Sequence, residues 1–186
     1  MFLNLAVVIV AALGSSLSLV TQDWDAADRA TVRLEPAAFP NLPAGIRSEL
    51  ERRGCTIPQP FTATTPANAI KGRFMSANRT DWAVLCSRRR TSAILVFRGG
   101  VGSTAVELAT QADSGSLQTI DGNGKIGYSR AIAAASSRYI LDHYNAFAGP
   151  KPPPLDHEGI NDIFIEKGSV VWYWYRDRWL ELQGAD

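Results

Sequence analysis

A histidine stands between two acidic side chains near the carboxyl-terminal end of the sequence, and a third carboxylate follows. Asp156, His157 and Glu158 are consecutive, and Asp162 comes shortly after them. An imidazole beside carboxylates can transfer protons or bind a metal ion. The simpler interpretation is a loop histidine without a catalytic role. The other histidine, His143, falls on the apolar face of a predicted helix and is expected to be a hydrogen-bonded core residue.

A run of aromatic residues, Trp172-Tyr173-Trp174-Tyr175, is the most unusual feature of the chain. Successive side chains of a strand point to opposite faces, so the two tryptophans share one face and the two tyrosines share the other. One face must join the core. The other is a candidate platform for glycan rings or a protein partner, which requires at least one of the four to be substantially exposed. The alternative is that a helix or a second hairpin covers it.

Three consecutive arginines, Arg88, Arg89 and Arg90, occupy a predicted hairpin tip, with Arg79 nearby. They could form a docking patch for an anion, although a short basic run at a tip is more typical of a solvated turn. The same tip and the glycine-rich stretch 99–103 are the loops that an enzyme inhibitor could insert into its target. The stretch 99–103 lacks the lysine of a phosphate loop, so we exclude that motif.

The two cysteines, Cys55 and Cys86, are predicted to form a disulfide. In an oxidising compartment a lone pair of cysteines is more often bonded than free. Closing the loop between them would stabilise the fold by about 3 to 4 kcal/mol according to the chain-entropy argument. The bond requires the two Cα atoms to lie within about 7 Å of each other. The alternative, two buried thiols, applies only if the chain is never exported.

Residues 1–20 are predicted to be a signal peptide that directs export to the periplasm or beyond. Residues 2–20 are apolar and uncharged, and small residues follow the most apolar part, as a signal peptidase requires. The alternative is an anchor retained in the membrane, since the stretch is nearly long enough to span a bilayer. Residues 21–40 are expected to be an extended lead-in, and residues 41–186 a single α+β domain.

The composition limits the classes of partner. The formal net charge of +1 gives no strong field that could recruit nucleic acid or anionic lipid by electrostatics alone. We therefore exclude nucleic acid and expect a protein or a glycan of the cell envelope. The hydrophobic content of 46% is sufficient for one core, since the chain has the length of a single domain.

Local signals predict two helices and several hairpins. Residues 41–54 can form a helix that Asn41 caps and Gly54 ends in the left-handed conformation. A second helix is predicted over residues 137–147, before Gly149. Elsewhere apolar residues recur at every second position, as in strands. Hairpins are therefore predicted over residues 81–98, 116–133 and 161–183. The expected fold is α+β, with a predominantly antiparallel sheet built from hairpins.

Two stretches, residues 72–97 and 153–175, share a pattern in which Asp81 or Asp162 opens an apolar strand, a polar turn follows and a second strand returns. The residues before each strand resemble the loop of FG-GAP repeats, the calcium-binding blades of integrin-type propellers. Two copies cannot close a propeller, so the resemblance implies only two related hairpins. The chain also resembles a group of exported bacterial proteins with a Pro-rich segment, D-H-x-G-I-x-D and a terminal G-A-D, and that resemblance carries no activity with it.

The FG-GAP resemblance implies calcium ligands at Asp156, Glu158 and Asp162, the acidic positions that the second stretch retains. Three carboxylates held close together would repel one another unless a cation lay among them. Pro154 takes one ligand position, so we expect weak binding, with a Kd on the order of 10⁻⁴ to 10⁻³ M. The alternative is that no cofactor binds and Asp162 caps the loop through backbone N–H groups.

No catalytic constellation emerges from these patterns. The sequence is therefore interpreted as an exported, non-enzymatic binding or structural module of the cell envelope. The alternative is an envelope-acting, metal-dependent hydrolase that uses the Asp156–Asp162 loop. A hydrolase would gather His157 and at least two of the carboxylates around one cleft, whereas a binding module would leave them apart or satisfied by backbone groups.

Overall fold

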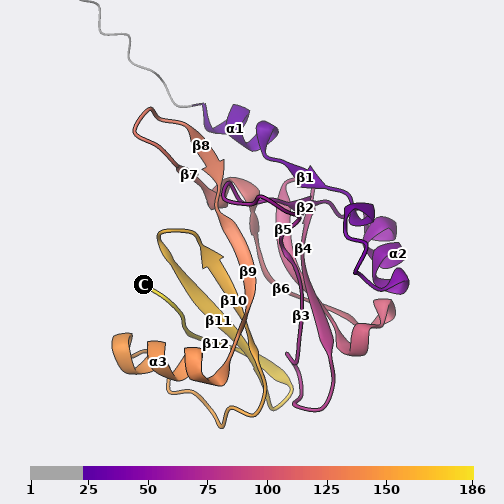
Figure 1. Cartoon of the computed structure of the whole chain (residues 1–186), viewed down its shortest axis with the longest axis vertical. Coiled ribbons are helices and arrows are strands. Elements are labelled where there is room, and N and C mark those ends of the chain that lie inside the picture. The colour runs from indigo at the N-terminus through magenta and orange to yellow at the C-terminus, as the bar shows by residue number, and fades with distance from the viewer. Residues whose placement is uncertain (1–22) are drawn as a thin grey trace, which may run out of the picture.

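The computed structural model describes residues 23–186, so the predicted signal peptide, residues 1–20, lies outside the described residues. Two four-stranded antiparallel sheets form the centre of the molecule, and each is paired in chain order (Figure 1). The first contains β3 (Ala69–Gly72), β4 (Asp81–Arg88), β5 (Thr91–Phe97) and β6 (Ala105–Ala112). The second contains β9 (Arg130–Ala135), β10 (Gly159–Phe164), β11 (Gly168–Tyr175) and β12 (Arg178–Gln183).

Shorter elements surround the two sheets. The helices are α1 (Trp24–Ala30), α2 (Ala44–Arg53) and α3 (Ser137–Phe147). Two small sheets pair β1 (Arg33–Leu34) with β2 (Ile57–Pro58) and β7 (Leu117–Thr119) with β8 (Ile126–Tyr128). The 3₁₀ turns are η1 (Pro36–Ala38), η2 (Arg98–Gly100), η3 (Gly102–Thr104) and η4 (Asp113–Ser116). The predicted α+β class with a predominantly antiparallel sheet is confirmed.

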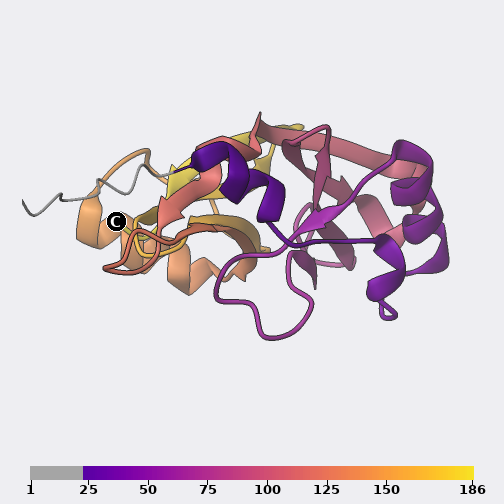
Figure 2. The same ribbon diagram turned by 90° about the horizontal axis from the view of Figure 1, so that it is seen from above.

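Three apolar clusters arrange these elements in the order helix, sheet, sheet, helix. The central cluster joins the facing sides of the two sheets and includes Leu85, Ile94 and Ile160. A second cluster fills the space between the first sheet and α2, and a third packs the second sheet against α3. Figure 2 shows α2, in indigo, and α3, in orange, at opposite ends of the molecule. Strands β4 and β5 are buried on both faces, which explains their continuous apolar sequence.

Helices α2 and α3 form where the sequence predicts them, because their ends carry local signals. Gly54 ends α2 with a φ of 67°, and its N–H donates to the carbonyls of Glu51 and Leu50. Pro43 holds the cap position of α2 without a side-chain hydrogen bond, so the prediction that Asn41 caps the helix is wrong. Ser136 caps α3, with its hydroxyl oxygen accepting from the Tyr139 N–H.

The lead-in, residues 21–40, is not wholly extended as predicted, because it contains α1. The Asp23 carboxylate caps this helix by accepting from the Ala26 N–H at 2.8 Å, and the alanines that follow favour helix. Arg33 then holds α1 to the rest of the protein through Asp28 at 2.6 Å and the buried Asp113 at 2.8 Å. Within residues 23–186, no helix is long and apolar enough to cross a membrane.

The predicted disulfide between Cys55 and Cys86 is confirmed, with a Cα–Cα distance of 5.1 Å. It joins the residue that follows α2 to strand β4. Beside it, Thr56 and Ser87 exchange two backbone hydrogen bonds of 3.0 and 2.8 Å. The end of α2 is therefore fixed to the sheet both covalently and through the backbone.

A buried asparagine joins the two large sheets at their neighbouring edges. The Asn68 amide nitrogen donates to the carbonyls of Pro58 and Arg130, and its amide oxygen accepts from the Ile132 N–H at 3.0 Å. Asn68 lies just before β3 with a φ of 69°, a conformation that asparagine tolerates better than most residues. Its side chain thus supplies the hydrogen bonds that a strand beside β9 would otherwise make.

Candidate functional site

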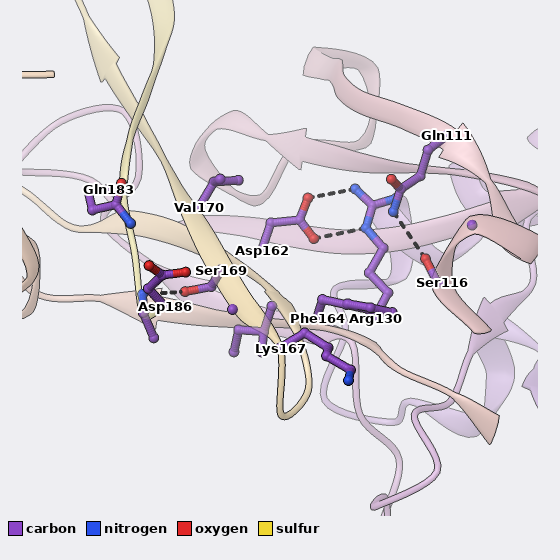
Figure 3. A pocket seen from close by; sticks show the side chains of 14 residues that line it. Gln111, Ser116, Arg130, Asp162, Phe164, Lys167, Ser169, Val170, Gln183 and Asp186 are labelled. Carbon is purple, nitrogen blue, oxygen red and sulfur yellow. Dashed lines mark hydrogen bonds and ion pairs between the residues drawn. The ribbon is translucent and has the colours of Figure 1, made fainter. Parts of the chain in front are cut away.

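A cleft of about 420 Å³ lies on the inner side of the second sheet, next to β6 and η4. Strands β9, β10 and β11, the turn after β10 and the carboxyl-terminal segment supply most of its wall (Figure 3). The polar side chains that line it are Gln111, Ser116, Arg130, Asp162, Lys167, Ser169, Gln183 and Asp186. This cleft is the candidate functional site.

An ion pair between Arg130 and Asp162 lies at the centre of the cleft wall. The Nε and one terminal nitrogen of Arg130 each donate to a different carboxylate oxygen of Asp162, both at 2.8 Å. The two residues belong to adjacent strands and are diagonal neighbours on one face, since Arg130 stands opposite Phe164 in the β9–β10 register. The Arg130 side chain is 2% exposed and that of Asp162 is 12% exposed.

The remaining Arg130 donors reach the first sheet. One terminal nitrogen contacts the carbonyl and the hydroxyl of Ser92 on β5, at 3.3 and 3.2 Å. The other also donates to the Ala109 carbonyl on β6 at 2.7 Å. A guanidinium has five N–H donors, and these contacts use all of them. Arg130 therefore joins the two sheets and retains no donor for a ligand.

Strand β6 is distorted where it meets Arg130. Ala109 has a φ of 54°, and the β5–β6 register shifts between Ser92 and Ile94. A left-handed conformation costs an alanine about 1 to 2 kcal/mol. The distortion places the Ala109 carbonyl against a charged donor, and charge-assisted hydrogen bonds are the stronger kind. The bulge is thus part of the structure that fixes the cleft.

Other polar groups in the cleft remain available to a ligand. Each Asp162 oxygen accepts one hydrogen bond from Arg130, although a carboxylate oxygen can accept two. Lys167 is exposed at the rim, and its side chain has no ion-pair partner among residues 23–186. The Gln111 amide nitrogen donates to the Ser116 hydroxyl, as drawn in Figure 3. The cleft thus presents a cation, an oriented carboxylate and the amide side chains of Gln111 and Gln183.

The three carboxylates of the calcium prediction have separate partners. Asp162 is paired with Arg130, and Glu158 accepts from the backbone N–H of Arg73 at 2.8 Å. The Asp156 side chain is 75% exposed. No group of three or more His, Cys, Asp or Glu residues within 23–186 could hold a metal ion. The arrangement therefore lends no support to a calcium site at these positions.

The two aspartates of the repeated pattern have different roles. Asp81 opens β4 and accepts from the backbone N–H groups of Met75 and Gly99, at 2.9 and 2.8 Å. Asp162 lies inside β10, which begins at Gly159. Its carboxylate accepts from Arg130 on the neighbouring strand β9. The loop-capping role that the sequence assigns to Asp162 as an alternative is thus filled by Asp81 in the first stretch.

His157 is held by backbone carbonyl groups on both sides of its ring. Nδ1 lies 3.0 Å from the Glu158 carbonyl oxygen, and Nε2 lies 3.0 Å from that of Trp174. The ring is stacked on Tyr173 and the residue is 7% exposed. Among the three carboxylates, that of Asp156 approaches it to 3.7 Å. The hydrolase alternative requires His157 and at least two of the carboxylates around one cleft. The structure does not bring them together in this way.

His143 is hydrogen-bonded as predicted, with Nδ1 2.8 Å from the Tyr139 carbonyl oxygen. It is half-buried rather than enclosed in the core. The contact lies within a single helix, so it positions no second element. His143 therefore has no part in the cleft.

The aromatic run alternates between faces as predicted. Trp172 and Trp174 pack against the central cluster, and Tyr173 and Tyr175 belong to the cluster beneath α3. Tyr173 is fully buried and the other three are half-buried. Burial raises the pKa of the Tyr173 hydroxyl, which donates to the Asp156 carboxylate at 3.3 Å. An exposed aromatic platform is not supported, because the first sheet covers one face and α3 the other.

Arg130 is the residue of the cleft that sequence reasoning missed. It alternates in phase with Ile132 along β9, so it points toward the central cluster. A charged residue in phase with buried ones predicts a buried partner of opposite charge. That pattern was a usable signal for the pair, although it does not indicate which carboxylate would be the partner.

Comparisons with protein families, curated proteins and solved structures find no match to this chain. The geometry of the cleft is therefore the basis for assigning a function. The buried Arg130 and Asp162 pair fixes the wall, and Lys167 at the rim is the cation that a ligand can reach.

Proposed function

We propose that this protein is an exported, non-enzymatic binding module that holds a hydroxyl- and amide-rich component of the cell envelope in the cleft between its sheets. The observation that carries the proposal is the complete use of the Arg130 donors within the protein. The wall of the cleft is therefore fixed before a ligand arrives, which lowers the entropic cost of binding. Asp162 and Lys167 are then left to recognise the ligand.

A binding role fits the side chains better than hydrolysis does. Both oxygens of the Asp162 carboxylate already accept from Arg130 at 2.8 Å, and no histidine among the described residues lines the cleft to act with it on a water molecule. His157 lies outside the cleft lining with both ring nitrogens against carbonyl oxygens. Carboxylate, ammonium and amide groups together recognise hydroxyl, amide and carboxylate groups, which are abundant in envelope glycans and their attached peptides. The disulfide supports export, because such bonds persist in oxidising compartments.

Co-sedimentation of the oxidised full chain with purified peptidoglycan sacculi tests the proposal. We expect saturable binding by the wild type and a loss of affinity of about fivefold in Lys167→Met, which removes the rim cation. The matched control is Lys151→Met, because Lys151 is also exposed but lies outside the cleft lining. No saturable binding by the wild type, or equal losses in the two variants, would contradict the proposal.

A further inference from the structure

A second hollow, of about 590 Å³, lies between the end of α2 and the tip of the β4–β5 hairpin. Three arginines line it, with two threonines and one glutamate: Arg53, Arg88, Arg89, Thr91, Thr110 and Glu107. We propose that this arginine pocket binds an oxyanion of the phosphate or sulfate type. The site is separate from the cleft of the proposed function and does not depend on it.

The basic run at the hairpin tip divides between two roles. Arg90 turns away to the Asp28 carboxylate at 3.3 Å, and Arg79 pairs with Asp81 at 3.3 Å. Arg88 and Arg89 remain at the pocket, where Arg53 of α2 joins them. The side chain of Arg89 has no ion-pair partner in the part of the chain that the structure describes. It is therefore the arginine of the pocket with a free charge.

The other two arginines are positioned by carboxylates and still have donors to offer. Arg53 uses its Nε to bind Glu49 at 2.6 Å, and Arg88 uses one terminal nitrogen to bind Glu107 at 2.9 Å. Each guanidinium has five N–H donors, so most of the donors remain for a ligand. Guanidinium groups match the geometry of phosphate-type oxyanions through paired N–H donors.

The walls of the pocket are held at a fixed separation. Gly54 and Arg53 belong to one wall and the hairpin tip to the other, and the bond between Cys55 and Cys86 connects the two. A pocket that does not have to close around its ligand loses less entropy on binding. Arginine and threonine side chains of the pocket already bind one oxyanion of the protein itself. The Glu107 carboxylate accepts from both Arg88 and the Thr110 hydroxyl.

The turn that presents Arg89 is conformationally costly. Arg89 and Arg90 have φ values of 51° and 61°, in a two-residue hairpin turn where asparagine and glycine are strongly preferred. A bulky residue in this conformation is unfavourable. Glycine would form the same turn without strain, so the Arg89 side chain can be removed without loss of the turn. The β11–β12 turn offers a matched position, because Arg176 there has a φ of 49°.

The test is a titration of the oxidised full chain with inorganic phosphate in a chloride buffer of low ionic strength, followed by amide chemical shifts. We expect saturable shifts in residues 53–54 and 88–91. Arg89→Gly should weaken binding about fivefold or more, as loss of a charged hydrogen-bond donor predicts, without lowering the melting temperature. Arg176→Gly should leave the affinity unchanged.

Two outcomes would overturn the assignment. One is the absence of saturable shifts in the wild type at the pocket. The other is an equal loss of affinity in Arg89→Gly and Arg176→Gly, which would show a response to overall charge. A parallel titration with polyphosphate at equal phosphate concentration identifies the source of the group. Tighter binding per phosphate assigns the pocket to an oxyanion carried on a polymer, and equal binding assigns it to a free ion.

Discussion

The two halves of the molecule share one plan and differ in how the outer helix is attached. Each half is a four-stranded antiparallel meander with a helix packed on its outer face. In the first half, α2 precedes the sheet and is bonded to β4 through Cys55 and Cys86. In the second half, α3 follows β9 and packs through Ile140, with a hydrogen bond of 2.9 Å from the Asn161 amide to the Tyr139 hydroxyl.

The difference predicts unequal stability in the two outer layers. Helix α2 buries Ile46 and Leu50 completely, whereas α3 buries Ile140 but leaves Leu141 45% and Phe147 46% exposed. Fewer buried contacts and no covalent bond allow a helix to open without unfolding the rest of the domain. We therefore expect α3 to open locally and α2 to open only with the whole first half.

The largest expected effect comes from removing Arg130, whose side chain pairs with Asp162 in the second half and contacts Ser92 and Ala109 in the first. Arg130→Met leaves the Asp162 charge in a mostly buried position without its partner, and removes the donor to three acceptors on the first sheet. We expect the free energy of unfolding in urea to fall by about 3 to 5 kcal/mol. Arg130→Met combined with Asp162→Leu should recover part of the loss, because neither charge is then buried. A loss below about 1 kcal/mol in the single variant would contradict the joining role.

The next effect comes from the bond that distinguishes the halves. Cys55→Ala with Cys86→Ala opens a covalent loop with a sequence separation of 31 and should lower the free energy of unfolding by about 3 to 4 kcal/mol. Hydrogen exchange should then show faster exchange in α2 relative to α3. If the two helices lose protection equally, the proposed asymmetry between the halves is wrong.

A smaller and more local effect is expected in the second half. Ile140→Ala should destabilise the contact of α3 with its sheet by about 2 to 3 kcal/mol, because Ile140 is fully buried. Amide protection should be lost in α3 and retained in β4 and β5. Leu141→Ala is the control on the same helix, since an exposed residue should change stability by less than about 0.5 kcal/mol. Loss of protection in β4 and β5 would show that α3 is coupled to the whole core.

The smallest effect concerns an ion pair on each helix. Hydrogen bonds from Arg52 and Arg53 lower the pKa of Glu49 to about 2 from its ordinary value of 4.5. A lowered pKa adds stability above the ordinary value that is lost as the pH falls toward 2. Glu49→Gln should therefore lower the melting temperature at pH 6 and change it little at pH 2. On α3, Asp142→Asn should have no measurable effect at pH 6, since its 3.5 Å pair with Arg138 is exposed.

The parts of the fold that depend on local signals could be predicted from the sequence. The bounds of α3 agree with the apolar period and the stop at Gly149, and Gly54 ends α2 as expected. The cysteine pair was predictable because the chain offers a single pairing. Helix α1 was missed because seven residues are too few to show a clear period, and its stability depends on the distant Asp113.

The candidate site was harder to predict because it depends on register between strands. Asp162 was singled out, but its partner Arg130 lies 32 residues away in sequence and becomes a neighbour only through the β9–β10 pairing. The carboxylates at Asp156 and Glu158 are close to it in sequence, but their contacts are with Tyr173 and Arg73 instead. Spacing along the chain therefore identified Asp162 as a residue of the site, but it did not identify the residue with which Asp162 pairs.

The Asn68 side chain has a consequence for aggregation. An unpaired strand edge can template the addition of a strand from another copy of the chain. Asn68 occupies the Arg130 carbonyl and the Ile132 N–H, the groups on β9 that would receive such a strand. Among the described strands of the two large sheets, the other edges are β3, β6 and β12. Each carries a charged side chain, such as Lys71 on β3, Glu107 on β6 and Glu181 on β12, which disfavours stacking into fibrils.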